Sequence, residues 1–305
     1  MRLESMVGSA LAGALTVSTF VAATRRQEEA RRRRAPGGTS VLADRIGGEI
    51  EYVLSGPPPA GGCPVIVCEN GLGSPLESWD WIVQELQEEF TLLRYHRRGY
   101  ARTSSVHRPA ALIESLLEGL FGSVPVLCFV SHSIGSLVTA NVLHESPRLR
   151  QRTKAVFTID GTDATLLETA RNSPEGLGRY RQMSIQEGLA SVTGLSWWTV
   201  NKMAIDVNYR ARVQESYLVE ASHPRTLFVA HREYLNEPLI GQEALASYEF
   251  DRHVIAAGDN VTQQRELAKR TAADFSFIEK SNHRSIIGKI TFARTVARTV
   301  RDALK

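Results

Sequence analysis

The sequence predicts an α/β fold: a mostly parallel sheet covered by helices on both faces, with a helical cap inserted into it. Residues 64–69 and 124–130 are continuous apolar runs, which are typical of strands buried on both faces. Strand-like and helix-like segments alternate up to residue 160, and this rhythm predicts parallel strands joined by right-handed crossovers. Residues 161–250 then have a mostly helical pattern, so that a cap between two core strands fits best.

The remaining elements follow from periodicity and turn residues. Strands over 41–45 and 49–54 meet at a Gly-Gly turn and are predicted to form a hairpin, and apolar residues at helical spacing predict a helix over 76–90. The other predicted elements are strands over 91–95, 125–130, 155–159, 253–257 and 275–278, with helices over 110–120, 136–143, 262–273 and 285–304. The predicted division is a leader over 1–38, a core over 39–160 and 251–305, and a cap over 161–250.

The leader differs in character from the rest of the chain. Residues 7–23 are uncharged and are followed by clustered arginines, but 17 residues is the lower limit for crossing a bilayer. As an anchor, this segment would keep the arginines and the body in the cytoplasm. A secretory signal fits less well, because its positive charge precedes the apolar run. A membrane anchor and a loosely docked helical leader both remain open.

Charge and cysteine content argue against several classes of site. Residues 1–34 hold seven Arg against three Glu, which is a net charge of +4, whereas the whole chain has a net charge of +3. The rest of the chain therefore has a net charge of 3 − 4 = −1. The body is nearly neutral and has no electrostatic footprint for nucleic acid. Cys63, Cys68 and Cys128 cannot all pair with one another, and two of them lie in predicted buried strands, so reduced thiols are expected. The sequence has no C-x-x-C and no H-E-x-x-H motif, and it predicts no metal and no cofactor.

The pentapeptide at 131–135, Ser-His-Ser-Ile-Gly, is the strongest functional signal. It directly follows an apolar strand and precedes a small-residue helix, which is the setting of a nucleophile elbow that would expose Ser133. A serine-rich turn without function is the alternative, but the flanking strand and helix favour catalysis.

Four segments together resemble the α/β-hydrolase family over residues 41–305. They are Glu-Asn-Gly-Leu-Gly at 69–73, Tyr-His-Arg-Arg-Gly-Tyr at 95–100, the elbow, and a late Asp followed by a late His. The resemblance implies an α/β-hydrolase fold with the chain order Ser, acid, His.

The resemblance assigns the general base to His283, which follows the last strand and precedes the last helix. His132 adjoins the nucleophile in sequence, but the elbow is expected to point it away. Asp259, after the strand that follows the cap, is the preferred acid, although relatives often have a longer gap after the glycine. Asp160, at the end of the strand after the elbow helix, is the alternative acid, or else a strand-end turn residue.

The resemblance also implies an oxyanion hole made by the backbone N–H groups of Leu72 and Ile134. Asn70 stands where relatives usually have His, and this change leaves the backbone donor unaffected. Residues 97–100 resemble the segment that supports the oxyanion loop, which implies a structural role.

The predicted function is a cofactor-free serine hydrolase that cleaves a carboxylic ester-like bond in a small molecule with an apolar acyl or aromatic part. A serine nucleophile argues against epoxide hydrolases and haloalkane dehalogenases, which use a carboxylate in this fold. Trp197 and Trp198 either line the substrate pocket or pack the cap. Haloperoxidase, C–C hydrolase and acyltransferase chemistry remain open, as does a binding protein without turnover.

Overall fold

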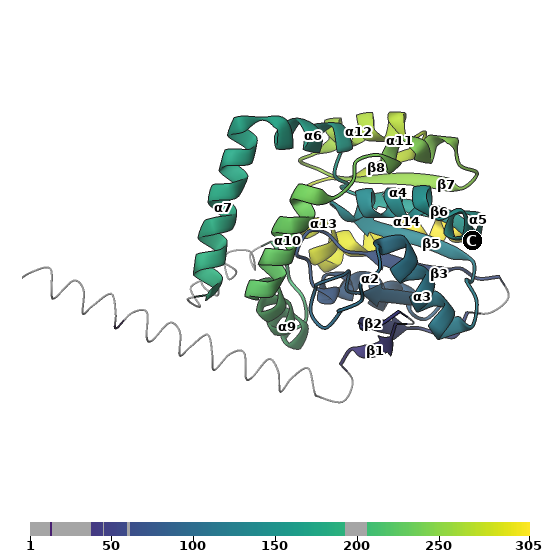
Figure 1. The fold of residues 1–305 in the computed structure, drawn as a ribbon. Helices are drawn as coiled ribbons and strands as arrows, with labels where there is room; N and C mark the ends of the chain where they lie inside the picture. Colours follow the sequence, from purple (N-terminus) through teal and green to yellow (C-terminus); the bar gives the residue numbers. More distant parts are fainter. Residues whose placement is uncertain (1–12, 14–37, 45, 60–61, 193–205) are drawn as a thin grey trace, which may run out of the picture.

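The computed structural model describes residues 13, 38–44, 46–59, 62–192 and 206–305. Eight strands form one sheet in the order β1-β2-β4-β3-β5-β6-β7-β8. The strand β2 is antiparallel to β1 and β4, and every other pair is parallel, which confirms the predicted mostly parallel sheet (Figure 1). The strands are β1 (Ser40–Ala43), β2 (Glu49–Ser55), β3 (Val65–Glu69), β4 (Thr91–Tyr95), β5 (Leu127–His132), β6 (Thr153–Ile159), β7 (Asp251–Ala257) and β8 (Asp274–Ile278).

Most helices of the core agree with the sequence pattern, but α5 (Pro147–Arg152) was not predicted and two other helices differ. The helix expected over 76–90 begins as a 3₁₀ turn and ends at Leu86, and the last helix is interrupted at Lys289, whose backbone is extended. The core helices are η1 (Leu76–Trp79), α2 (Asp80–Leu86), α3 (Pro109–Phe121), α4 (Gly135–Glu145), α5 (Pro147–Arg152), α12 (Val261–Arg270), α13 (Ser285–Gly288) and α14 (Ile290–Leu304).

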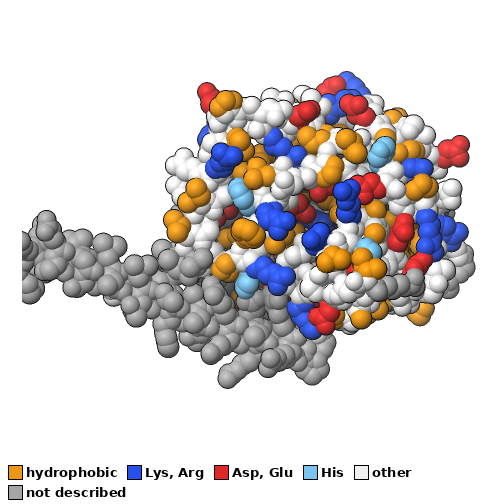
Figure 2. Space-filling model, in the orientation of Figure 1, with side chains coloured by type: hydrophobic (Ala, Val, Ile, Leu, Met, Phe, Trp, Pro, Cys, Tyr) orange, Lys and Arg blue, Asp and Glu red, His pale blue; other side chains and the backbone are white. Residues whose placement is uncertain are grey.

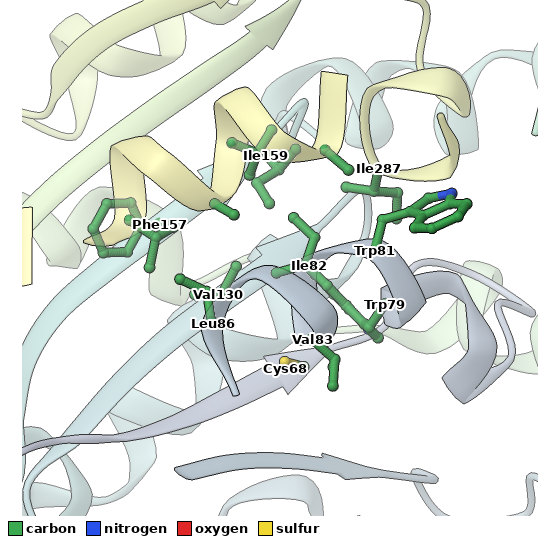
Figure 3. Packing of buried hydrophobic residues seen from close by; sticks show 14 of the residues in the cluster. Cys68, Trp79, Trp81, Ile82, Val83, Leu86, Val130, Phe157, Ile159 and Ile287 are labelled. Carbon is green, nitrogen blue, oxygen red and sulfur yellow. The ribbon is translucent and has the colours of Figure 1, made fainter. Parts of the chain in front are cut away.

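Both faces of the sheet are buried, which explains the continuous apolar runs. Alternate residues of β3 enter two different clusters: Ile66 and Cys68 face the cluster with α2 and α14, and Val65 and Val67 face the cluster with α3 and α4. Figure 3 shows the first cluster, in which side chains of η1 and α2 lie against residues of β5 and β6. A strand between two apolar layers has no polar face, so its sequence does not alternate.

In the described part of residues 161–250, every regular element is a helix. These elements are α6 (Ala164–Asn172), α7 (Pro174–Val192), α9 (Ala211–Ala221), α10 (Pro224–Asn236), α11 (Gly241–Ala244) and η2 (Leu245–Ser247). Figure 1 shows α7 at the edge of the molecule, and it packs against α6 and α10. The helical character of this insertion agrees with the sequence, while the domain boundaries stay a prediction.

Several expectations concern residues outside the described part of the chain. The apolar segment 7–23, apart from Gly13, falls there, and so do Trp197 and Trp198. Among the helices that the structure describes, none has the length and apolar character needed to cross a membrane. Cys68 and Cys128 are buried in β3 and β5 as free thiols. Acidic and basic side chains are both spread over the face of the body seen in Figure 2.

Candidate active site

The elbow holds Ser133 in the conformation that the sequence motif predicts. Ser133 lies between β5 and α4 with φ of 58°, a left-handed conformation that is costly for a residue with a Cβ. Gly135 is required by close packing, because a Cβ there would lie 2.5 Å from the carbonyl oxygen of Glu69. The start of α4 therefore sits directly on the end of β3, and the serine is raised at the turn between strand and helix.

His283 lies opposite Ser133, on the loop between β8 and α13. Its Nε2 is 3.0 Å from the Ser133 Oγ. The preceding residue, Asn282, shapes this loop: its side-chain oxygen accepts hydrogen bonds from the N–H groups of Arg284 and Ser285. The predicted nucleophile and base, which are 150 residues apart in sequence, are thus within hydrogen-bond distance.

The other imidazole nitrogen of His283 contacts Asp160. The His283 Nδ1 and the Asp160 Oδ2 are 2.5 Å apart. The Asp160 Oδ1 accepts hydrogen bonds from the backbone N–H of Ala257, at 3.0 Å, and from the side-chain amide of Asn260, at 3.2 Å. Burial alone would raise the pKa of Asp160, but the hydrogen bonds from His283 and Ala257 outweigh burial and lower it. The carboxyl group is therefore held ionised beside the imidazole.

The structure does not bring the preferred acid, Asp259, to His283. Asp259 is exposed and lines a shallow groove at the start of α12, together with Asp163 and Glu266. The Asn260 N–H donates to the Ala257 carbonyl, so the chain turns tightly after β7 and brings Asn260, rather than Asp259, toward Asp160. The structure brings the alternative residue, Asp160, to His283. Asn260 is a contributor that sequence reasoning missed, because no motif marks it.

His132 lies next to Ser133 and, like His283, lines the cavity described below, but its environment differs from that of His283. Its Nε2 is 2.8 Å from the carbonyl oxygen of His283, so this nitrogen must carry a proton, and its Nδ1 is buried without a hydrogen-bond partner among the described residues. Burial, with a smaller effect of the neighbouring His283, lowers the pKa of His132 to about 3. A group this weakly basic is a poor proton acceptor, but the reason is burial and not the expected orientation, because the His132 ring lines the same cavity as Ser133.

The loop after β3 passes close to the nucleophile. A Cβ on Gly71 would lie 3.3 Å from the Ser133 Cβ, so only a glycine leaves this approach unobstructed. Within the described chain, the N–H groups of Leu72 and Ile134 donate no hydrogen bond to a protein acceptor. Both are therefore free to bind an oxygen atom from outside the protein.

Ser133 and His283 lie at a cavity of about 340 Å³ between the sheet and the cap. This volume is in the range of small-molecule sites. The cap contributes tyrosines and apolar side chains that sequence reasoning did not single out: Tyr180, Met183, Val207, Tyr209, Tyr217, Leu227 and Ala230. In the described residues, no group of His, Cys, Asp and Glu has the arrangement of a metal site.

No protein-family model and no curated protein matches the sequence. Solved structures do match the fold. An esterase from Thermogutta terrifontis aligns with a TM-score of 0.64 at 15% identity, over 88% of this chain and 100% of its own. A hydrolase from Pseudomonas aeruginosa PA01 aligns with a TM-score of 0.63 at 20% identity, over 88% of this chain and 99% of its own. The enol-lactonase from Burkholderia xenovorans LB400 aligns with a TM-score of 0.60 at 20% identity, over 87% of this chain and 99% of its own. With this strand order and these structural matches, the chain has the α/β-hydrolase fold.

Proposed function

We propose that the protein is a serine hydrolase that cleaves carboxylic ester-like bonds of small molecules, with Ser133 as nucleophile, His283 as general base and acid, and Asp160 as the acid that orients His283. The observation that carries this proposal is the hydrogen-bonded series from the Ser133 Oγ through His283 to Asp160. A serine hydroxyl is a weak nucleophile until such a base takes its proton.

In the acylation step, the Ser133 Oγ attacks the ester carbonyl carbon while the His283 Nε2 takes the hydroxyl proton. The ionised Asp160 stabilises the imidazolium that forms and keeps its Nδ1–H directed at the carboxylate. The N–H groups of Leu72 and Ile134 donate to the carbonyl oxygen as it becomes negative. Collapse of the tetrahedral intermediate breaks the ester C–O bond, and His283 gives its proton to the leaving alcohol.

In the deacylation step, water replaces the alcohol. His283 takes a proton from this water as its oxygen attacks the acyl-enzyme carbonyl, and the same proton returns to the Ser133 Oγ when the acid product leaves. No cofactor enters either step.

The cavity indicates the class of substrate. Its cap side is formed by tyrosines and aliphatic side chains, which favour an apolar acyl chain or an aromatic group. The names of two structural neighbours, an esterase and an enol-lactonase, agree with an ester-like bond.

Covalent labelling tests the proposal directly. We expect a fluorophosphonate probe to label the folded protein and to fail with Ser133→Ala, while p-nitrophenyl ester turnover falls by about 10⁵- to 10⁶-fold. Ser247→Ala, at an exposed serine on η2, is the matched control and should be labelled like the unsubstituted chain. A folded protein that is not labelled would favour a binding module that keeps the fold without turnover.

A further inference from the structure

Three charged side chains form a buried cluster beside the proposed oxyanion loop. Glu69 ends β3, Arg97 follows β4, and Glu233 lies on the cap helix α10. The side chains of Glu69, Arg97 and Glu233 are 1%, 4% and 11% exposed. The Arg97 Nη1 lies 2.6 Å from the Glu69 Oε1, and its Nε and Nη2 lie 2.6 and 2.7 Å from the two Glu233 oxygens. The guanidinium therefore joins the core to the cap through a bidentate pair with Glu233.

Burial of three charges is costly unless each is fully hydrogen-bonded, and the cluster meets this condition. The hydroxyl of Tyr95 donates to Glu69, and the hydroxyl of Tyr100 donates to Glu233 at 2.8 Å. Burial alone would lower the pKa of Arg97, but Glu233 and Glu69 outweigh it and raise the pKa well above its ordinary value. Arg97 thus stays charged.

The same guanidinium holds the loop that carries the Leu72 N–H. The Arg97 Nη1 donates to the Asn70 carbonyl at 2.6 Å, and the Nη2 lies 3.4 Å from the Gly71 carbonyl oxygen. The Gly71 carbonyl and the Leu72 N–H belong to one planar peptide group, so the direction of the first sets the direction of the second.

Tyr100 makes a parallel connection. Its hydroxyl accepts a hydrogen bond from the Gly73 N–H at 3.3 Å while it donates to Glu233. The loop and the cap helix α10 are therefore linked through two side chains, Arg97 and Tyr100. The same helix contributes Leu227, Ala230 and His231 to the cavity, so the helix that lines the substrate space also carries Glu233.

We propose that Arg97 is a positioning residue that couples the docking of α10, through Glu233, to the orientation of the Leu72 N–H. This inference rests on the proposed hydrolase function. With α10 docked, Glu233 fixes the guanidinium and the guanidinium fixes the Gly71–Leu72 peptide. With α10 displaced, Arg97 keeps its contacts with Glu69 and the loop carbonyls but loses the bidentate pair with Glu233 that fixes the plane of its guanidinium. The Leu72 N–H is then held in place less precisely. Lysine cannot replace this arginine, because a single ammonium does not reproduce the planar fork of donors.

A double-mutant cycle of Arg97→Lys and Glu233→Gln tests the coupling. Each single variant is expected to lower kcat by about 10- to 100-fold, less than the loss of a whole oxyanion donor, with KM within about threefold. Because both act on one link, the double variant should be no slower than the slower single variant. Additive losses, or a change in KM alone, would overturn the coupling.

Two further variants separate this role from a structural one. Arg270→Met removes another cap-to-core ion pair, with Asp163, whose hydrogen-bond partners among the described residues do not include the oxyanion loop, and it should leave kcat within about twofold. An equal loss in that variant would mean that any loosening of the cap slows turnover. Tyr100→Phe breaks the parallel link and supplies the same test if Arg97→Lys does not fold. An unsubstituted chain with neither turnover nor probe labelling would overturn the hydrolase function and the coupling together.

Discussion

The ends of β6 and β7 are neighbours in the sheet, and an aspartate follows each of them, yet the two aspartates have different environments. The strands pair in parallel up to Ile159 and Ile255. Asp160 is 1% exposed and contacts His283, whereas Asp259 is exposed on a shallow groove.

The distance from the end of the strand explains the difference. Asp160 follows β6 immediately, and its N–H still bonds to the Ile255 carbonyl at 2.8 Å, so the sheet itself positions this residue. Asp259 comes two residues after β7 ends, within the tight turn that the Asn260 N–H closes on the Ala257 carbonyl. The end of β7 contributes donors instead, the Ala257 N–H and the Asn260 amide, and both hold Asp160. The end of β6 supplies the carboxylate that contacts His283, and the end of β7 supplies hydrogen-bond donors that keep this carboxylate ionised.

Within the comparison of the two strand ends, the largest effect is expected when each aspartate in turn is exchanged for asparagine. Asp160→Asn should lower kcat for p-nitrophenyl esters by about 10⁴-fold, because an amide neither stabilises the imidazolium nor fixes the tautomer. Asp259→Asn, the matched control, should remain within about twofold. The reverse order of losses in steady-state kinetics would mean that the acid lies at the end of β7.

Comparison with the sequence shows which parts of the site were predictable. The positions of Ser133 and His283 could be predicted because a local sequence pattern marks each of them. Ser133 lies in an elbow motif after an apolar strand, and His283 lies in the loop before the last helix. The aspartate that contacts His283 was not predictable, because an aspartate follows each of two neighbouring strands and only the sheet decides which of them faces His283.

The contacts between the cap and the core could not be predicted either, because they join residues that are far apart in the sequence. Glu233 meets Arg97 across 136 residues, and no local pattern marks either residue as a partner of the other. The sheet and its covering helices were predictable because burial on both faces leaves a continuous apolar signal, whereas helix packing in the cap leaves no such signal.

A smaller effect is expected at Asn260. Asn260→Ala removes one of the two hydrogen bonds to the Asp160 Oδ1 and leaves the bond from the Ala257 N–H, so Asp160 should keep its contact with His283 but hold it less firmly. We expect kcat to fall by about tenfold, since one hydrogen bond to a charged group is worth about 1.5–3 kcal/mol at most. Asp259→Ala, one residue earlier, is the control. Equal losses in both variants would indicate a disturbed turn rather than a loosened acid.

The smallest effect concerns stability at low pH. Hydrogen bonds hold the pKa of Asp160 below its ordinary value of 3.8, so the unfolded chain takes up this proton at a higher pH than the folded protein does. The stabilisation from Asp160 is therefore complete above pH 3.8 and is lost as the pH falls through the lowered pKa of the folded state. Urea unfolding at a series of pH values should show a stability difference between the unsubstituted chain and Asp160→Asn at about pH 5 that shrinks below about pH 4. Asp259→Asn leaves the Asp160–His283 pair in place, so this variant should lose stability at low pH in the same way as the unsubstituted chain. A difference that stays constant down to pH 2.5 would mean that Asp160 is not held ionised by its partners, and the contrast between the two strand ends would then rest on geometry alone.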